Sequence, residues 1–307
     1  MHIRFLLQCA GWSLPILTGT LLFVGLYWDS FPAPRLTTNI AVNEQVDRLA
    51  RSSSHRLDVL AVGSSMTLNN LATGPVLEHF GTTHYENAAA WGIGAQELEL
   101  YAPLFIRHFR PDQVIVVTNM MDMQRGSPLG TEDTVAIGRH LRSGGGVLPY
   151  LRHWNSPYYL RQMRTNRIRF NDPSNYEFLG YDAHGGSTLE VPEALIDRTR
   201  FNEPPPLMAD LDAGRMAAFA RFARYLRTNN VDLLVLCSPY RDGLRTPDTD
   251  REAQAFVTML ENVLRPMGHK LVNGYEAQWT DDLYCDASHF DHAGAEAFTR
   301  WCLSRAE

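Results

Sequence analysis

Short apolar runs alternate with amphipathic stretches over much of the chain. Apolar runs bounded by turn residues, typical of buried strands in a parallel sheet, lie at residues 58–62, 85–90, 113–117, 231–236 and 270–272. Stretches with helical periodicity lie at residues 68–80, 95–109, 211–228 and 250–264. Such alternation predicts a parallel sheet with helices on both faces. We therefore predict an α/β fold, a three-layer α/β/α sandwich around a central, mostly parallel five-stranded sheet.

The alternation is interrupted between about residues 120 and 210. This stretch holds glycine runs at 144–146 and 185–186 and three prolines at 204–206. Because glycine and proline favour turns, we predict an insertion with irregular connections here. Residues 29–56 show little apolar periodicity and predict a polar tether. The predicted organisation is a segment 1–28, a tether 29–56 and a domain 57–307 that contains the insertion.

The amino-terminal segment predicts a membrane anchor. Residues 5–28 contain no Asp, Glu, Lys or Arg. As a helix they would extend roughly 36 Å, enough to cross the hydrocarbon core of a bilayer. No small-residue cleavage site follows, so a retained single-pass anchor is favoured over a cleaved signal peptide. Because Arg4 and the free amine carry the flanking positive charge, we predict an inner (cytoplasmic) membrane protein with its domain on the periplasmic side.

The charge of the chain is unevenly distributed. Its formal net charge of −6 argues against a general attraction to nucleic acid. Residues 134–171 nevertheless lack Asp, Glu and Lys, and they contain several arginines, among them Arg161, Arg164 and Arg167, together with Trp154. Arginine pairs with carboxylate or phosphate, and aromatic rings favour membrane interfaces. Two interpretations stay open: a surface for an anionic glycan, lipid headgroups or a membrane partner, or arginines that neutralise acidic residues elsewhere on the protein.

Three residues from the two ends of the domain predict a catalytic site. Ser65 follows the first predicted strand at a turn that contains Gly63, with Ser64 as the competing hydroxyl. In open α/β sheets the ligand site lies beyond the carboxyl ends of the strands, where Ser65 is expected. Asp286 precedes His289 by three positions, so the carboxylate can orient the imidazole. These groups activate a serine nucleophile, and we predict Ser65, Asp286 and His289 as catalytic.

A nucleophilic serine also needs donors that stabilise the negative charge of the reaction intermediate. Gly92 follows the second predicted strand, and Asn119 follows the third. We predict that the backbone N–H of Gly92 and the side-chain amide of Asn119 face Ser65 as an oxyanion hole. No phosphate-binding loop and no metal-ligand spacing of histidines occurs in the sequence, so neither a metal nor another cofactor is predicted.

These motifs resemble the SGNH (GDSL-type) hydrolase superfamily, whose motif residues are serine, glycine, asparagine and histidine in that order. The matching residues here are Ser65, Gly92, Asn119 and His289. Residues 63–67 resemble the Gly-Asp-Ser-x-Ser block, with Ser64 in place of the aspartate and threonine in place of the last serine. Residues 87–92 resemble the Asn-(four residues)-Gly block, Asp-x-x-His is matched in full, and the Gly-x-Asn-Asp block is matched at its asparagine. The resemblance implies an SGNH, flavodoxin-like sheet.

The amino-terminal segment and the altered first block resemble one subgroup in particular, the membrane-anchored extracytoplasmic SGNH proteins that O-acylate exopolysaccharides or teichoic acids. The resemblance implies an acyl-Ser65 intermediate, with His289 as general base and then general acid, Asp286 as its orienting group, and Gly92, Asn119 and the Ser65 N–H as the oxyanion hole. It also implies an envelope polysaccharide or other glycan as acceptor and a membrane-bound O-acyltransferase as partner. O-acetyltransferase and acetylesterase activity both stay open, because the two reactions share the first step.

The alternative from another functional class is a non-catalytic SGNH-fold protein that binds polysaccharide or scaffolds a membrane complex. Ser64 and Met120, which stand where the family has acidic residues, motivate it. An α/β-hydrolase is not predicted, because no Gly-x-Ser-x-Gly elbow is present.

Overall fold

Five parallel strands form the centre of the computed structural model, which describes residues 2–27, 31–54, 56–124, 130–169 and 180–306. In chain order they are β1 (Val59–Ala61), β2 (Tyr85–Asn87), β3 (Gln113–Thr118), β4 (Asp232–Cys237) and β5 (Lys270–Asn273). The strands pair in the order β2-β1-β3-β4-β5, and every pairing is parallel. The predicted α/β fold with a five-stranded parallel sheet is confirmed.

Side chains of alternate strand residues enter two separate apolar cores. One core, which contains Leu60 and Val114, is covered by α2 (Ile40–Arg51), α5 (Ala95–Phe109), α6 (Thr131–Arg142), α10 (Ala213–Thr228) and α11 (Pro247–Leu264). The other, which contains Val59 and Ile115, is covered by α3 (Ser65–Asn70), α4 (Thr73–Phe80) and α12 (His292–Leu303). Because neighbouring strand residues point to opposite faces, the sheet is buried on both sides and forms the middle of three layers.

One predicted helix of the domain is divided in two. The periodicity predicts a single helix at residues 68–80, whereas the structure has α3 and α4, separated by Leu71 and Ala72. The backbone N–H of Ala72 donates to the hydroxyl of Thr299 at 2.9 Å. This contact joins residues that are 227 positions apart, so local periodicity does not reveal it. By contrast, α5 covers the predicted residues 95–109 without change.

The stretch predicted as a polar tether, residues 29–56, contains the helix α2. Asn39 caps this helix by accepting the N–H of Val42 at 3.1 Å. Val42, Val46 and Leu49 share one face of α2 and are buried in the core, at 2%, 0% and 0% exposure. Their spacing of four and three positions is that of a helix face. The sequence therefore contained the apolar spacing of a helix, although polar residues surround these three positions.

The insertion at residues 120–210 is more regular than predicted. Besides α6 it contains α7 (Val147–Arg152), α8 (Ser156–Arg169) and α9 (Arg198–Phe201). Gly144 and Gly145 connect α6 to α7 with φ angles of 66° and 75°, which glycine adopts readily. Ile137 and Leu141 of α6 are buried against the core. The first part of the insertion thus belongs to a helical layer.

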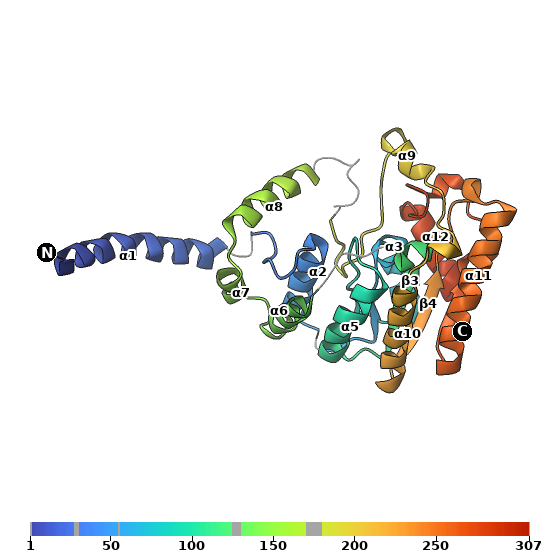
Figure 1. The fold of residues 1–307 in the computed structure, drawn as a ribbon, viewed down its shortest axis with the longest axis horizontal. Helices are drawn as coiled ribbons and strands as arrows, with labels where there is room; N and C mark the ends of the chain where they lie inside the picture. The colour runs from blue at the N-terminus through green and yellow to red at the C-terminus, as the bar shows by residue number, and fades with distance from the viewer. Residues whose placement is uncertain (1, 28–30, 55, 125–129, 170–179, 307) are drawn as a thin grey trace.

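The chain begins with α1 (His2–Tyr27), which Figure 1 shows extending away from the sheet on the side of α7 and α8. Ser13, Pro15 and Thr20 interrupt its apolar residues. Within the part of the chain that the structure describes, no helix is both long enough and apolar enough to cross a membrane. The transmembrane helix predicted for residues 5–28 is therefore not found.

Candidate active site

Ser65 lies at a tight turn between β1 and α3. Ser64 caps α3 by accepting the N–H of Met66 at 3.0 Å, which makes Ser65 the first residue of the helix. Gly63 has a φ angle of 151°, and a Cβ atom at this position would collide with the side chain of Thr67. The turn therefore requires glycine, and this requirement explains the glycine of the first motif.

Thr67 attaches the turn to the middle of the sheet. Its hydroxyl donates to the carbonyl oxygen of Val117 at 2.9 Å, and its oxygen accepts the N–H of Val117 at 2.9 Å. The Thr67 side chain is fully buried. Because Val117 belongs to β3, these two bonds hold the start of α3 against a neighbouring strand. Ser65 consequently lies at the carboxyl edge of the sheet, as predicted.

The structure brings Ser65, His289 and Asp286 together, although 224 positions separate the serine from the histidine. His289 Nε2 lies 2.9 Å from Ser65 Oγ, and His289 Nδ1 lies 2.8 Å from Asp286 Oδ2. The side chains of His289 and Asp286 are 5% and 6% exposed. Hydroxyl, imidazole and carboxylate therefore form one hydrogen-bonded chain, the arrangement that activates a serine nucleophile.

Several donors keep Asp286 in its ionised form. Its Oδ1 accepts the backbone N–H groups of Ser288 at 2.9 Å and His289 at 2.8 Å. Arg200 Nη2 lies 3.4 Å from its Oδ2. Burial alone would raise the pKa of Asp286, but the charge of His289 and the hydrogen bonds to the carboxylate outweigh burial and lower the pKa to about 2. Asp286 can thus orient the imidazole and stabilise its protonated form.

Asn70 joins the serine half of the site to the histidine half, and sequence reasoning missed it. Its Nδ2 donates to the carbonyl oxygen of Ser288 at 2.9 Å, and its Oδ1 accepts the N–H of Phe290 at 3.0 Å. Ser288 and Phe290 flank His289, whereas Asn70 ends the helix that begins with the nucleophile. These partners lie 218 and 220 positions away in the chain, so no local pattern marks Asn70.

The loop after β2 contacts the catalytic histidine. The rings of Trp91 and His289 lie 5.2 Å apart, centroid to centroid, with an interplanar angle of 37°. The adjacent Gly92 is exposed and has a φ angle of 71°, a conformation that favours glycine. The structure therefore places Gly92 next to a residue that touches His289, and its oxyanion role stays a prediction. Trp91 lies within the motif at residues 87–92, but nothing in the sequence indicates that it contacts His289.

Asn119 lies close to the nucleophile, but its side-chain amide contacts Met66, the residue that follows Ser65. The side chain is fully buried, and its Nδ2 lies 3.0 Å from Met66 Sδ. Its Oδ1 accepts the N–H of Met121 at 3.0 Å. Among the hydrogen bonds of the described residues, none joins Asn119 to Ser65. The amide nitrogen that was expected to face Ser65 therefore contacts the sulfur atom of Met66. The oxyanion role of Asn119 stays a prediction.

A half-buried carboxylate, Asp122, lies beside the altered first motif. It accepts the hydroxyl of Thr118 at 2.9 Å and lines a small cavity together with Thr118 and Ser64. Burial raises the pKa of Asp122 to about 6, while hydrogen bonds from Ser64 and Thr118 and the charge of His289 act in the opposite direction. An acidic group therefore contacts Ser64, the position at which the resembled family has an aspartate of its own.

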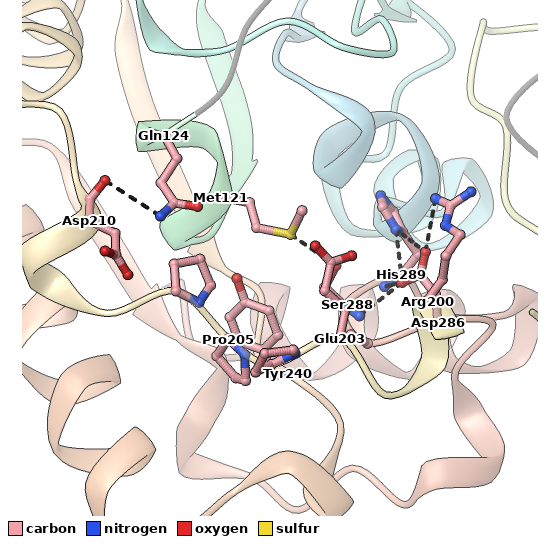
Figure 2. Close-up of a pocket in the computed structure, with 13 residues that line it drawn as sticks. Met121, Gln124, Arg200, Glu203, Pro205, Asp210, Tyr240, Asp286, Ser288 and His289 are labelled. Carbon is pink, nitrogen blue, oxygen red and sulfur yellow. Dashed lines mark hydrogen bonds and ion pairs between the residues drawn. The ribbon is translucent and has the colours of Figure 1, made fainter. Parts of the chain in front are cut away.

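A pocket of about 400 Å³ opens beside the triad. Figure 2 shows that Asp286, Ser288 and His289 line one side of this pocket. The end of the insertion also lines the pocket: Glu203 lies beside Ser288, and Asp210 lies at the end of the pocket away from the triad. Sequence reasoning treated this end of the insertion as irregular and assigned it no place in the site. Among the described residues, no three His, Cys, Asp or Glu side chains are close enough together to hold a metal ion.

The predicted basic surface lies elsewhere. Arg161, Arg164 and Arg167 are exposed on α8, and Trp154 is 46% exposed just before it. Figure 1 shows α8 well apart from α3 and α12, and none of these four residues lines the pocket beside the triad. The structure therefore separates the arginine-rich surface from Ser65 and His289. Its role as a substrate or partner surface stays a prediction.

Among known proteins, this chain is similar to several solved structures. No protein-family model and no curated protein matches the chain. A GDSL-like lipase from Bacteroides thetaiotaomicron is 11% identical, with 87% of this chain and 98% of that chain covered and a TM-score of 0.40. A catalytic mutant of an acetylxylan esterase from Geobacillus stearothermophilus is 10% identical, with 83% and 95% covered and a TM-score of 0.40. A lipase/acylhydrolase from Enterococcus faecalis is 10% identical, with 82% and 98% covered and a TM-score of 0.37.

One of these solved structures is described as GDSL-like, the type of hydrolase that the sequence motifs resemble. The identities and TM-scores of the three structures are too low to indicate the activity or the substrate of this chain. In the order of its motif residues Ser65, Gly92, Asn119 and His289, this chain resembles the SGNH (GDSL-type) hydrolases.

Proposed function

We propose that the protein transfers acyl groups through an acyl-Ser65 intermediate, as an O-acetyltransferase or acetylesterase of polysaccharide. The observation that carries the proposal is the pair of hydrogen bonds made by His289, 2.9 Å to Ser65 Oγ and 2.8 Å to Asp286 Oδ2. A serine hydroxyl is a weak nucleophile until a base removes its proton. Here the base is within hydrogen-bonding distance of the hydroxyl, and a buried carboxylate orients it.

In the first half-reaction, Ser65 Oγ attacks the carbonyl carbon of the acyl donor while His289 Nε2 takes the hydroxyl proton. Collapse of the tetrahedral intermediate breaks the bond between that carbon and the leaving oxygen, and the imidazolium gives its proton to the leaving alcohol. Asp286 stabilises the imidazolium between these steps, because its ionised carboxylate lies 2.8 Å from Nδ1. The products are acyl-Ser65 and a free alcohol.

In the second half-reaction, an acceptor hydroxyl gives its proton to His289 Nε2 and attacks the acyl group of Ser65. Collapse of this intermediate breaks the acyl–Oγ bond, and Ser65 regains its proton from the imidazolium. A sugar hydroxyl as acceptor yields a new ester, whereas water yields a free acid. Both outcomes use the same three residues, so the choice between transfer and hydrolysis depends on what occupies the space beside His289.

A polysaccharide of the cell envelope or an exported glycan is the proposed acceptor. Its support comes from the motif resemblance to extracytoplasmic SGNH proteins that O-acylate such polymers. The pocket next to His289 adds a second argument, because it is lined by polar side chains such as Gln124 and Glu203. A membrane-bound O-acyltransferase that supplies acyl groups at the outer face of the cytoplasmic membrane is the proposed partner.

The test is acylation of Ser65 by an activated acetyl ester. The full-length protein is mixed with 4-nitrophenyl acetate, nitrophenol release is followed, and the acetylated residue is identified by peptide mass spectrometry after rapid acid quench. Ser65→Ala and His289→Ala are expected to abolish both signals. Ser304→Ala and His79→Ala, which change exposed residues outside the site, serve as matched controls and are expected to react like the unmodified protein.

Absence of nitrophenol release from the unmodified protein would favour the non-catalytic alternative. Absence of nitrophenol release, or release that persists in Ser65→Ala, would reject an acyl-serine mechanism.

A further inference from the structure

The exposed faces of α7 and α8 carry the same arrangement of side chains. In each helix, two apolar residues at positions i and i+3 are followed by an arginine at i+4: Leu148, Leu151 and Arg152 on α7, and Leu160, Met163 and Arg164 on α8. Residues with this spacing share one face of a helix. All six are exposed, the four apolar residues by 71%, 38%, 59% and 55% in chain order. Together with Trp154, which lies between the helices and is 46% exposed, we call them the α7–α8 face.

The other sides of the two helices are fixed to the body of the protein. Tyr150 and Tyr159 are buried, at 0% and 4% exposure, and their rings stack with centroids 6.5 Å apart. The Tyr158 hydroxyl donates to the carbonyl oxygen of Ala33 at 3.2 Å and accepts the side-chain amide of Asn43 at 3.3 Å. Because these contacts hold the inner sides, the apolar residues of the α7–α8 face stay on the outside.

The protein does not neutralise the arginines of the α7–α8 face. Residues 134–171 contain no Asp, Glu or Lys. Within the described part of the chain, the side chains of Arg152, Arg161 and Arg164 make no ion pair and no hydrogen bond. Burial and then the charge of Arg152 lower the pKa of the neighbouring His153. The face is therefore positively charged, and the interpretation that these arginines neutralise acidic residues elsewhere on the protein does not hold for them.

A further apolar surface adjoins the α7–α8 face. Figure 1 shows α1 meeting the rest of the molecule beside α7 and α8. There, the ring of Phe31 lies 6.1 Å from that of Trp154 and 6.0 Å from that of Phe23 in α1. Phe23 and Leu26 of α1 are 54% and 71% exposed. Single exposed apolar residues are ordinary, but apolar residues gathered at one end of a protein mark an interaction site.

We propose that the α7–α8 face binds the surface of a membrane that contains anionic lipids. At such a surface, apolar side chains enter the boundary between headgroups and acyl chains, arginines reach the lipid phosphates, and tryptophan lies at the level of the headgroups. An anionic polysaccharide would pair with the arginines but would offer no apolar phase to Leu148, Leu160 and Met163. The inference goes beyond the proposed function, because it assigns a surface apart from Ser65 and needs no acyl transfer.

The test is binding of the full-length protein to lipid vesicles, measured by flotation in a density gradient. Vesicles of phosphatidylcholine are compared with vesicles that also contain phosphatidylglycerol. The unmodified protein is expected to bind the anionic vesicles about 10-fold more tightly, and added salt is expected to reduce this preference. The double variant Arg152→Glu with Arg164→Glu is expected to bind them about 10-fold or more weakly, because each basic residue near an anionic surface contributes roughly fivefold.

Two further variants separate charge from apolar contact. Arg224→Glu with Arg227→Glu is the matched control, because it changes the net charge equally at exposed positions of α10. It is expected to change binding to anionic vesicles less than about twofold. Leu160→Ser removes one apolar side chain of the face and is expected to weaken binding to both kinds of vesicle about 3- to 10-fold.

A second measurement decides the outcome if α1 holds every variant on the vesicles. The emission of Trp154 is obtained as the difference between the unmodified protein and Trp154→Phe. This emission is expected to be quenched by lipids that carry bromine on their acyl chains, because the ring contacts the bilayer.

Three results would overturn the inference: equal binding to neutral and anionic vesicles, an equal loss of binding in the two charge-reversal variants, or Trp154 emission that brominated lipids leave unquenched. Binding of polygalacturonate that depends on Arg152 and Arg164, without binding of vesicles, would assign the face to an anionic polysaccharide instead. None of these measurements uses acylation of Ser65, so their failure is distinct from failure of the proposed function.

Discussion

Two regions of this protein concentrate polar side chains, and they differ in how those side chains are held. At the carboxyl edge of the sheet, Asp286 and His289 are 6% and 5% exposed and are hydrogen-bonded to each other and to Ser65. On α8, Arg161 and Arg164 are exposed to solvent. A buried polar group is tolerated only when its partners are provided, whereas an exposed arginine needs none. The buried cluster therefore constrains function far more tightly than the basic surface does.

The largest expected effect comes from breaking the buried cluster itself. Ser65→Ala and His289→Ala are each expected to lower kcat for 4-nitrophenyl acetate about 10⁴-fold or more, because the two residues act as one unit. For the same reason the double variant is expected to be no slower than either single variant. Steady-state kinetics with thermal unfolding as a folding check measures this. Losses that multiply in the double variant would contradict a shared role.

Asn70 tests how the two halves of the cluster are held together. Asn70→Ala removes the amide that bonds to Ser288 and Phe290 and leaves two buried backbone groups without this partner. The expected cost is about 1–3 kcal/mol of unfolding free energy, together with a fall in kcat, since His289 is no longer fixed relative to Ser65. Denaturant unfolding and kcat for 4-nitrophenyl acetate measure the two effects.

Asn69→Ala is the matched control for Asn70→Ala. Asn69 is the neighbouring residue, is equally buried, and donates to the carbonyl oxygen of Ser187 instead. We expect Asn69→Ala to lower stability while kcat is retained. Equal losses of kcat in both variants would show that Asn70 contributes only to general stability.

The sequence predicts the elements and residues whose signals are local. The strands are visible as short apolar runs, α5 as an amphipathic stretch, and Asp286 and His289 as a pair at helical spacing. α2 also had a local signal in Val42, Val46 and Leu49, but these residues are scattered among polar ones and were interpreted as a tether. The apolar residues between positions 5 and 28 likewise predicted a membrane span, whereas no helix of the described residues is both long enough and apolar enough to cross a membrane.

Other features of the site depend on contacts between distant parts of the chain. Asn70 bonds to residues more than 200 positions away, and Met66 meets Asn119 across 53 positions. The segment that precedes the pocket wall at residues 203–206 is held by Arg241, whose Nε donates to the carbonyl oxygen of Phe201. No spacing within one stretch of sequence encodes these contacts. The nucleophile and its base were therefore predictable, whereas the groups that position them were not.

Asp122 provides a smaller test at the edge of the buried cluster. Its pKa is raised from an ordinary value of 3.8 to about 6, so the folded protein binds a proton here more tightly than the unfolded chain does. The resulting stability is present below pH 3.8 and is lost as the pH rises through about 6. Asp122→Asn stays neutral and is expected to avoid this loss. The Tm of the unmodified protein should therefore fall relative to that of the variant between pH 4 and pH 7, by roughly 2–4 °C for a difference of about 1 kcal/mol.

Asp112→Asn is the control for this titration, because Asp112 has a 64% exposed side chain paired with Arg56 on the surface. Its Tm is expected to follow that of the unmodified protein over the same pH range. A Tm difference between Asp122→Asn and the unmodified protein that does not change with pH would assign Asp122 a packing role without a titration.

The smallest effect on kcat/KM is expected from substitutions on the basic surface of α8. Arg161→Glu and Arg164→Glu are expected to change kcat/KM for 4-nitrophenyl acetate less than about twofold, because exposed charges at a distance are screened by salt. In cells the same variants separate the two functional classes. If the protein is an enzyme, Ser65→Ala abolishes glycan acylation and charge reversal on α8 at most weakens it. If it is a non-catalytic scaffold, Ser65→Ala is tolerated and charge reversal abolishes function. The two functional classes thus predict opposite outcomes for Ser65→Ala and for charge reversal on α8. Measuring glycan acylation in cells that carry each variant decides between the two classes.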